Sequence, residues 1–315
     1  MKNILVIGAA GQIGSELVPH LRQLGYMTVA GTSGRTPLPA HLAEGPSAVV
    51  NLMDTDALKK TVEHFQIDTV MNLAAILSAT AEADPLKAWR VGVDGVIGLL
   101  ELARDKKLAV FTPSSIGAFG PSTPLKFTPQ DTVCRPQTIY GITKVTDELL
   151  GDYYRQKYGV DARSVRYPGL ISYVTPPGGG TTDYAVDIYW QAVKNGSYIS
   201  PLARGTYLPM MFMDDALRAA VELMEADPAR LKHFNGFNVS AMSFSPEEIA
   251  ASIRRHIPGF ELGYAINPML QAIADSWPDA LDDSVATEEW DWHSRYTLDD
   301  MTDVMIREIS KRTAA

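Results

Sequence analysis

The sequence predicts an α/β fold: a doubly wound parallel sheet followed by a smaller C-terminal domain. Short apolar runs alternate with helical patterns through the first half of the chain, which is typical of a parallel sheet flanked by helices. A turn with three glycines follows the first apolar run directly. The alternation ends after Gly169, where Pro, Gly and Thr predict a loop. We therefore expect one domain over residues 1–169, joined by later sheet elements from about 207–240, and an interleaved second domain over 170–315.

Composition excludes several classes of function. The chain of 315 residues is 46% hydrophobic and 21% charged, as in ordinary soluble enzymes. Its formal net charge of -9 and pI near 5.2 argue against a nucleic-acid or anionic-membrane partner, because either would require a basic face. No apolar run approaches the ~20 residues that span a bilayer. The chain opens on a strand pattern rather than a signal peptide, so we expect a cytoplasmic protein.

Residues that bind metals are scattered along the chain. Cys134 is the single cysteine, so no intramolecular disulfide can form. The six histidines show no ligand spacing. We therefore expect no metal site.

The glycine turn marks the first functional element. Residues 2–7 form the first predicted strand, and Gly8-x-x-Gly11-x-x-Gly14 leads from it into a helix that runs to about Leu24. This order is the Rossmann-type dinucleotide-binding arrangement, in which the glycines bring the backbone close to a pyrophosphate at the helix N-terminus. The expected contacts are Gly8, Gly11, Gln12, Ile13 and Gly14.

The second predicted strand, residues 28–31, bears on the choice of cofactor. NAD enzymes usually place an acidic residue at its end to bind the ribose hydroxyls. Ser33 and Arg35 follow here instead, and both could meet the 2′-phosphate of NADP. NADP therefore stays open beside NAD.

The third and fourth strands are expected to end beside the same dinucleotide. The third covers 48–52, which places Asn51 and Leu52 near the adenine, and Asp54 then caps a helix to about Phe65. The fourth covers 69–75 and ends in Leu73, Ala74 and Ala75, where small side chains let a cofactor pass close to the backbone. Ser78, just beyond it in a loop, is a candidate active-site hydroxyl.

Later elements continue the pattern. The predicted first-domain elements are a long helix over 85–106, a strand over 109–114, a helix over 139–158 and a sixth strand over 162–167. The predicted later elements are a helix over 183–194, a strand and helix over 207–225, a capped helix over 245–256 and a final helix from about Leu298.

Tyr140 and Lys144 stand four residues apart in the helix predicted over 139–158, so they share one face. A neighbouring positive charge favours phenolate and lowers a tyrosine pKa from its reference near ~10. Such a tyrosine can take a proton from an alcohol. Tyr-x-x-x-Lys is also a common helical pair without function, so other features must support a catalytic role.

Those features come from a resemblance. The glycine turn, Asn72-Leu73-Ala74-Ala75, Ser115 and Tyr140-x-x-x-Lys144 together resemble the extended short-chain dehydrogenase/reductase superfamily, and the 25-residue step from Ser115 to Tyr140 matches its usual spacing. More specific strings look like the L-threonine 3-dehydrogenases of that superfamily. These strings are Arg166–Ser172, Pro177–Val186, Leu208–Asp215 and Ser276-Trp277-Pro278.

The resemblance implies oxidation of L-threonine by NAD at the 3-hydroxyl, giving 2-amino-3-oxobutyrate, as part of threonine catabolism. Tyr140 would be the base, Lys144 would assist it and hold the nicotinamide ribose, and Ser115 would bind the reacting oxygen. Ser78, Thr181 and Thr182 would orient the amino acid, and Trp277 would close over it. The resemblance also implies cofactor contacts from Tyr167, Pro168 and Leu170. It further implies a homodimer through helices near 94–107 and 140–158.

One departure and two alternatives remain. Gly92 stands where this superfamily usually carries an Asn that supports the cofactor side of the site. A nucleotide-sugar epimerase or dehydratase would carry an Arg where Leu208 stands, and a dehydratase would carry an acidic pair in place of Ile116-Gly117. A dinucleotide-binding sensor without catalysis would typically lose the tyrosine or the lysine.

Overall fold

The computed structural model describes residues 1–176 and 180–314. The chain divides into two compact units. The first unit comprises Met1–Ala118, Gln137–Arg166 and Leu217–Phe237, and the second comprises Phe119–Pro136, Tyr167–Ala216 and Asn238–Ala315. The assignment of dinucleotide binding to residues 1–169 and substrate binding to 170–315 stays a prediction. The loop residues Pro177, Gly178 and Gly179 lie outside the described residues.

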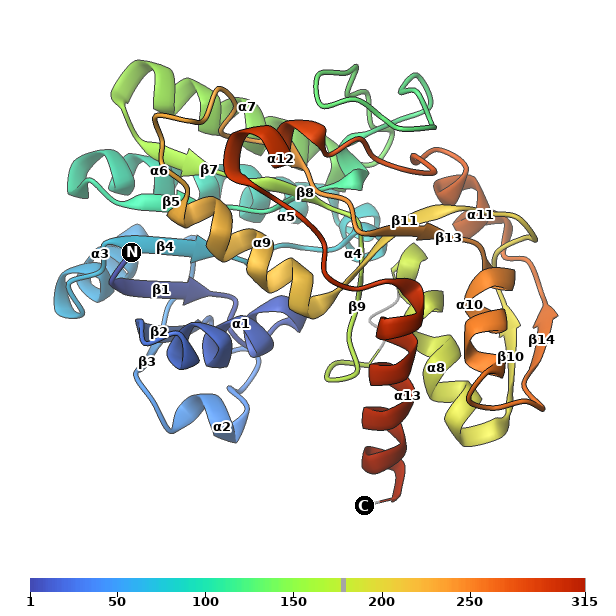
Figure 1. Ribbon diagram of the computed structural model, residues 1–315. Helices are drawn as coiled ribbons and strands as arrows, with labels where there is room; N and C mark the ends of the chain where they lie inside the picture. Colours follow the sequence, from blue (N-terminus) through green and yellow to red (C-terminus); the bar gives the residue numbers. More distant parts are fainter. Residues whose placement is uncertain (177–179, 315) are drawn as a thin grey trace. The chain divides into compact units, whose positions relative to one another are not determined.

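Six parallel strands form the sheet of the first unit, in the order β3-β2-β1-β4-β5-β7 (Figure 1). They are β1 (Asn3–Ile7), β2 (Met27–Thr32), β3 (Ser47–Val49), β4 (Thr69–Asn72), β5 (Ala109–Phe111) and β7 (Asp161–Arg163). The chain winds outward from β1 to β3, crosses to β4 and winds outward again to β7. This confirms the doubly wound parallel sheet.

Helices flank this sheet, and their apolar side chains pack with those of the strands to form its hydrophobic core. They are α1 (Gln12–Gln23), α2 (Ala40–Ala43), α3 (Thr55–His64), α4 (Ser78–Ala83), α5 (Pro85–Trp89), α6 (Gly95–Lys106) and α7 (Ile139–Tyr158), with short turns η1 (Arg90–Asp94) and η2 (Ile116–Ala118). Leu58 of α3, Leu99 of α6 and Tyr154 of α7 pack in one buried cluster with Leu5 and Val110 of the strands. Burial of such side chains contributes about 1.5–3 kcal/mol each, so the cluster fixes these helices on the sheet.

The second unit holds two small sheets. Strands β9 (Gly169–Ile171), β11 (Leu208–Phe212) and β13 (Met242–Phe244) form one in the order β13-β11-β9, and β10 (Ser197–Ser200) pairs with β14 (Glu261–Tyr264) in the other. Its helices are η3 (Thr181–Asp183), α8 (Tyr184–Asn195), α10 (Pro246–Arg254), α11 (Pro268–Ala274), α12 (Ser284–Trp290) and α13 (Leu298–Ala314). The boundary between the units falls within helix α9 (Met213–Glu225). Strands β6 (Ser114–Ser115), β8 (Val165–Tyr167) and β12 (Phe237–Asn238) form a further sheet in the order β12-β8-β6.

Predictions that rest on local capping signals are confirmed. Asp54 caps α3 by accepting from the Ala57 amide, and Ser245 and Glu248 form a capping box at the start of α10. Helix α7 has the predicted bounds, and Thr138 caps it by accepting a hydrogen bond from the Gly141 amide at 3.1 Å.

Predictions of long uninterrupted elements are wrong in several places. The helix expected over 85–106 is α5, a π-type turn at η1 and α6. The strand expected over 162–167 divides at Ser164, whose amide donates to Phe234 and whose carbonyl accepts from Phe237. These bonds take the chain out of the six-stranded sheet after β7. The strand expected over 109–114 likewise divides into β5 and β6.

The third and fourth strands end earlier than predicted. Strand β3 ends at Val49, so Asn51 and Leu52 follow it rather than complete it, and β4 ends at Asn72. Ser78 is the first residue of α4 and not a loop residue. Among the described residues, no helix combines the length and apolarity needed to cross a membrane.

Candidate dinucleotide and catalytic site

The glycine turn after β1 requires its glycines. Gly8 has a left-handed backbone with φ of 83°, and a Cβ there would lie 3.0 Å from the Leu73 carbonyl carbon. A Cβ on Gly14 would lie 2.3 Å from the Gly8 carbonyl oxygen. Gly11 donates to that same carbonyl at 2.9 Å. Side chains at Gly8 and Gly14 would therefore displace backbone, and the turn holds α1 tightly against the end of β1.

The N-terminus of α1 suits an anion. No side chain caps this helix at Gly11, and its first turn contains no acidic residue. The first amides of a helix have no intrahelical acceptor, and the helix dipole adds partial positive charge there. The amides of Gln12, Ile13 and Gly14 belong to this turn, so the residues present fit the pyrophosphate of a dinucleotide.

The segment after β2 is an exposed turn. Thr32 Oγ1 donates to the Thr36 carbonyl at 2.9 Å and accepts from the Gly34 amide at 3.3 Å. Ser33 and Arg35, which lie within this turn, are both exposed. No acidic side chain occurs between Thr32 and Thr36, so the turn itself does not distinguish NAD from NADP.

Two other predicted cofactor segments follow β3 and β4, which lie on either side of β2 and β1 in the sheet. Leu52 is buried against Gly95 at the start of α6, whereas Asn51 is exposed and accepts from the Met53 amide at 3.1 Å. The Leu73 amide donates to Ile7 at 2.9 Å, which brings Leu73 and Ala74 against Gly8. Ala75 follows as an exposed residue.

Ser115, Tyr140 and Lys144 lie together in the first unit. Tyr140 and Ser115 both lie close to Gly117: a Cβ on Gly117 would lie 3.0 Å from Tyr140 Cε1 and 3.5 Å from Ser115 Oγ. Ser115 Oγ accepts from the Gly117 amide at 3.1 Å. Lys144 Nζ lies 5.8 Å from the Tyr140 ring centroid. Tyr140 and Ser115 are half-buried, and Lys144 is 5% exposed.

Lys144 is held in place by two further contacts. Its Nζ donates to the Pro113 carbonyl, which precedes β6, at 2.9 Å, and it lies 3.6 Å from Asp147 Oδ2. Burial raises the pKa of Asp147 to about 7, against the opposing effect of Lys144. Asp147 was not predicted from the sequence, although its position three residues after Lys144 places it on the same helix face.

Gly92 lies in η1 against the helix that carries Tyr140 and Lys144. A Cβ on Gly92 would lie 3.1 Å from Thr143 Cβ. π-type turns within helices occur frequently at functional sites. Gly92 therefore allows η1 to approach α7 closely, at the residue that precedes Lys144.

Ser78 begins α4, which packs against α7. The Glu82 carboxylate of α4 accepts from the Ile139 amide at 2.7 Å. This bond ties the helix of Ser78 to the first turn of α7.

The remaining predicted residues belong to the second unit. Tyr167 is buried, with its hydroxyl donating to the Ala216 carbonyl at 2.6 Å, and it precedes Pro168 and Leu170 of the β9 segment. A Cβ on Gly169 would lie 2.8 Å from Thr182 Cβ, so Thr182 packs directly on β9. Thr181 is buried beside it.

Trp277 follows α11 in the second unit. Its side chain is 8% exposed and its amide donates to Ala274 at 3.1 Å. Helix α11 contacts η3, which contains Thr181 and Thr182. The second unit therefore brings the segments of these three predicted substrate residues together.

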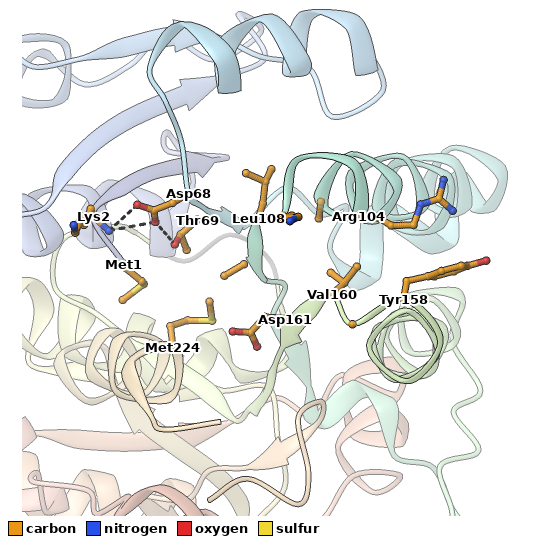
Figure 2. Close-up of a pocket in the computed structure, with 14 residues that line it drawn as sticks. Met1, Lys2, Asp68, Thr69, Arg104, Leu108, Tyr158, Val160, Asp161 and Met224 are labelled. Carbon is orange, nitrogen blue, oxygen red and sulfur yellow. Dashed lines mark hydrogen bonds between the residues drawn. The ribbon is translucent and has the colours of Figure 1, made fainter. Parts of the chain in front are cut away.

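A cavity of about 660 Å³ lies elsewhere in the first unit (Figure 2). Its lining includes the residues that begin β4, β5 and β7, so it lies at the amino edge of the parallel sheet, opposite the glycine turn. Figure 2 shows Asp68 bonded to Lys2 and Thr69, and the Asp68 carboxylate accepts from the Lys2 amide at 3.0 Å. None of the predicted site residues lines it.

Metal ligands form no cluster in the described part of the chain. Residues 1–176 and 180–314 contain no group of three or more His, Cys, Asp or Glu side chains arranged to hold an ion.

Comparison with known proteins places the chain in a family. The model of the NAD dependent epimerase/dehydratase family matches residues 4–239. An uncharacterized epimerase/dehydratase of Staphylococcus haemolyticus is 51% identical over 314 residues, which cover 99% of this chain and 99% of that protein.

Two solved structures are similar over nearly the whole chain. The L-threonine dehydrogenase of Clostridium difficile has a TM-score of 0.97 and 49% identity, and the match covers 100% of this chain and 99% of that one. A monomeric L-threonine 3-dehydrogenase from a metagenome has a TM-score of 0.92 and 40% identity, covering 98% of this chain and 99% of that one. The resemblance that the sequence motifs indicated is thereby confirmed, and the chain belongs to the NAD dependent epimerase/dehydratase family.

Proposed function

We propose that this protein oxidises L-threonine at the 3-hydroxyl with NAD, giving 2-amino-3-oxobutyrate. The observation that carries the proposal is the grouping of Ser115 and Tyr140 beside Gly117, with Lys144 near the Tyr140 ring, in the unit that also holds the uncapped glycine turn. The similarity to L-threonine dehydrogenases at 40–49% identity supports the choice of substrate.

The chain's own residues would bind the cofactor and move the proton. Bound NAD would supply the acceptor for the hydride that leaves C3 of threonine. Tyr140 Oη would take the hydroxyl proton as the carbon–oxygen double bond forms. The half-buried Ser115 Oγ would donate a hydrogen bond to the reacting oxygen. The Lys144 ammonium would stabilise the phenolate form of Tyr140 electrostatically.

The other predicted contacts keep their proposed roles. The cofactor would be held by Gly8, Gly11, Gln12, Ile13, Gly14, Ser33, Arg35, Asn51, Leu52, Leu73, Ala74, Ala75, Tyr167, Pro168 and Leu170. Ser78, Thr181, Thr182 and Trp277 would bind the amino acid. We also keep a cytoplasmic homodimer as a proposal, which sedimentation at working concentration would test. A monomer would contradict it, and one similar enzyme is described as monomeric.

Absorbance at 340 nm tests the proposal with one enzyme sample. Threonine, related 3-hydroxy amino acids, simple alcohols and sugar nucleotides are each supplied with NAD and with NADP. We expect reduced cofactor to accumulate with threonine and NAD. Turnover only of a sugar nucleotide would favour the epimerase or dehydratase, and tight NADH binding without any turnover would favour a sensor. A higher kcat/KM with NADP would assign cofactor choice to Ser33 and Arg35.

A further inference from the structure

Asp147 is a buried acid beside the proposed catalytic lysine. Its side chain is 7% exposed, and neither carboxylate oxygen has a hydrogen-bond partner among the described residues. The nearest cation is the Lys144 ammonium, 3.6 Å away. A buried carboxylate without donors is costly to ionise unless a nearby charge compensates it.

The surroundings of Asp147 offer little other compensation. A cavity of about 10 Å³ beside it is lined by Val96 and Leu100 of α6, by Val110 of β5 and by Ala162 of β7. The other lining residues besides Asp147 are Thr112, Gly151, Arg163 and Asn235. The Thr112 hydroxyl also lies buried without a partner. The walls that face the carboxylate are therefore mostly apolar.

The other charged groups nearby are either paired or exposed to solvent. Arg163 of β7 lines the cavity, but its guanidinium donates to Asp161 and to the Leu223 and Ala226 carbonyls. Glu148, the next residue on α7, accepts two hydrogen bonds from Arg166 at 2.8–2.9 Å. On η1, Arg90 and Asp94 are exposed. Lys144 is thus the cation that responds to the charge of Asp147.

We propose that Asp147 is a positioning residue that acts through Lys144: its charge state sets how much positive potential the lysine presents to Tyr140. With Asp147 neutral, the ammonium keeps its hydrogen bond to the Pro113 carbonyl and its position beside the Tyr140 ring without an opposing carboxylate charge. With Asp147 ionised, a carboxylate at 3.6 Å offsets that charge. The inference rests on the proposed roles of Tyr140 and Lys144.

The charge on Asp147 changes near neutral pH. Burial raises its pKa to about 7, so the carboxylate becomes ionised over the range in which enzymes commonly work. Each new negative charge opposes formation of the Tyr140 phenolate. In the wild type, kcat/KM therefore rises with pH over a wider range than it would if one group alone ionised. In Asp147→Asn, we expect this rise to be steeper and to occur at lower pH. The expected shift is roughly 0.5–1 pH unit, the size for a unit charge removed about two helical turns away.

The first test measures the charge pair without any substrate. Melting temperatures are recorded from pH 5 to pH 9 for the wild type, Asp147→Asn, Lys144→Met and the double variant. A raised folded-state pKa means that the folded protein binds more protons than the unfolded chain between about pH 4 and pH 7. Wild-type stability attributable to Asp147 is therefore lost as pH rises to 7, and Asp147→Asn is relatively more stable at pH 8 than at pH 5. This gain is larger in the Lys144→Met background, where the carboxylate lacks its cation.

The second test measures the kcat/KM profile with threonine and NAD. Asp152→Asn is the control, because Asp152 is an exposed carboxyl on the same helix, where it accepts a hydrogen bond from Asn235 at 2.9 Å more than one helical turn beyond Asp147. We expect Asp147→Asn to move the profile and Asp152→Asn to leave it in place. The inference is overturned if Asp147→Asn stabilises the protein equally with Lys144 and with Met at position 144. It is also overturned if the kcat/KM profile is moved only by Asp152→Asn or by neither variant. A wild type inactive on threonine contradicts the proposed function, while the melting cycle still decides whether Asp147 and Lys144 are coupled.

Discussion

Helix α7 carries two Tyr-x-x-x-Lys pairs, which share their spacing but differ in burial and in hydrogen bonding. Tyr153 and Lys157 form the second pair, with Lys157 Nζ donating to Tyr153 Oη at 2.7 Å. This hydrogen bond lowers the pKa of Tyr153, whose side chain is 45% exposed. Tyr140 is half-buried beside Ser115 and Gly117, and its lysine is buried and bound to Pro113.

The difference shows that the motif alone does not make a site. Tyr153 has the direct lysine contact, but its ring neighbours are the tyrosines Tyr154 and Tyr158 near the end of the helix. Tyr140 lies where β6 ends, in the unit whose parallel strands direct their carboxyl ends toward the glycine turn. Position beside the segment that follows β6, rather than spacing on a helix, therefore separates the two pairs.

Removing the two hydroxyls in turn gives the largest expected contrast. Tyr140→Phe keeps the ring against Gly117 and removes the base, so kcat should fall by at least ~100-fold, the low end for lost acid–base catalysis. NADH affinity should be retained. Tyr153→Phe is the control on the same helix and should leave kcat within about twofold. Steady-state rates and NADH fluorescence titrations measure both effects, and near-wild-type turnover by Tyr140→Phe would refute its role.

A methyl group in the glycine turn should act on cofactor binding instead. Gly14→Ala places a Cβ 2.3 Å from the Gly8 carbonyl oxygen, so the turn must shift. We expect NADH affinity to fall by at least ~10-fold, or about 1.4 kcal/mol, measured by fluorescence titration. Gly259→Ala is the matched control, because nothing lies within 4 Å of a Cβ there and its φ is not positive. Unchanged NADH affinity in Gly14→Ala would place the dinucleotide elsewhere.

The smallest expected effect concerns the exposed pair. Lys157→Met removes the hydrogen bond that lowers the pKa of Tyr153, and the free energy of unfolding should change by less than about 1 kcal/mol. Threonine oxidation should be unaffected. Denaturant unfolding and steady-state rates measure the two quantities. A loss of activity comparable with that of Tyr140→Phe would show that the two pairs had been assigned the wrong way round.

Local signals explain which parts of the fold could be predicted from sequence. Thr138 and Asp54 specify helix starts through their own side chains, so α7 and α3 begin where expected. The glycine turn is local at Gly14, where a Cβ would meet the Gly8 and Ala9 backbone, whereas a Cβ on Gly8 would meet Leu73, which follows β4. The candidate site could be predicted because it combines such local features at a characteristic spacing.

The rest depends on partners distant in sequence. The strand break at Ser164 follows from hydrogen bonds to Phe234 and Phe237, which no local pattern reveals. The π-type turn at η1 lets Gly92 pack on Thr143 of α7. The helical pattern of the sequence continues on both sides of this turn, so the pattern alone does not reveal it. The burial of Asp147 requires the apolar side chains of α6 and β5, so an acid on a helix gave no sign of its environment.

Transfer of hydrogen from threonine tests the central claim most directly. L-Threonine deuterated at C3 is mixed with the enzyme and NAD, and the reduced cofactor is analysed by mass spectrometry. Proton removal by Tyr140 coupled to hydride loss from C3 predicts one deuterium in each NADH and a slower rate than with unlabelled threonine. NADH without deuterium, or no NADH from threonine at all, would contradict the account.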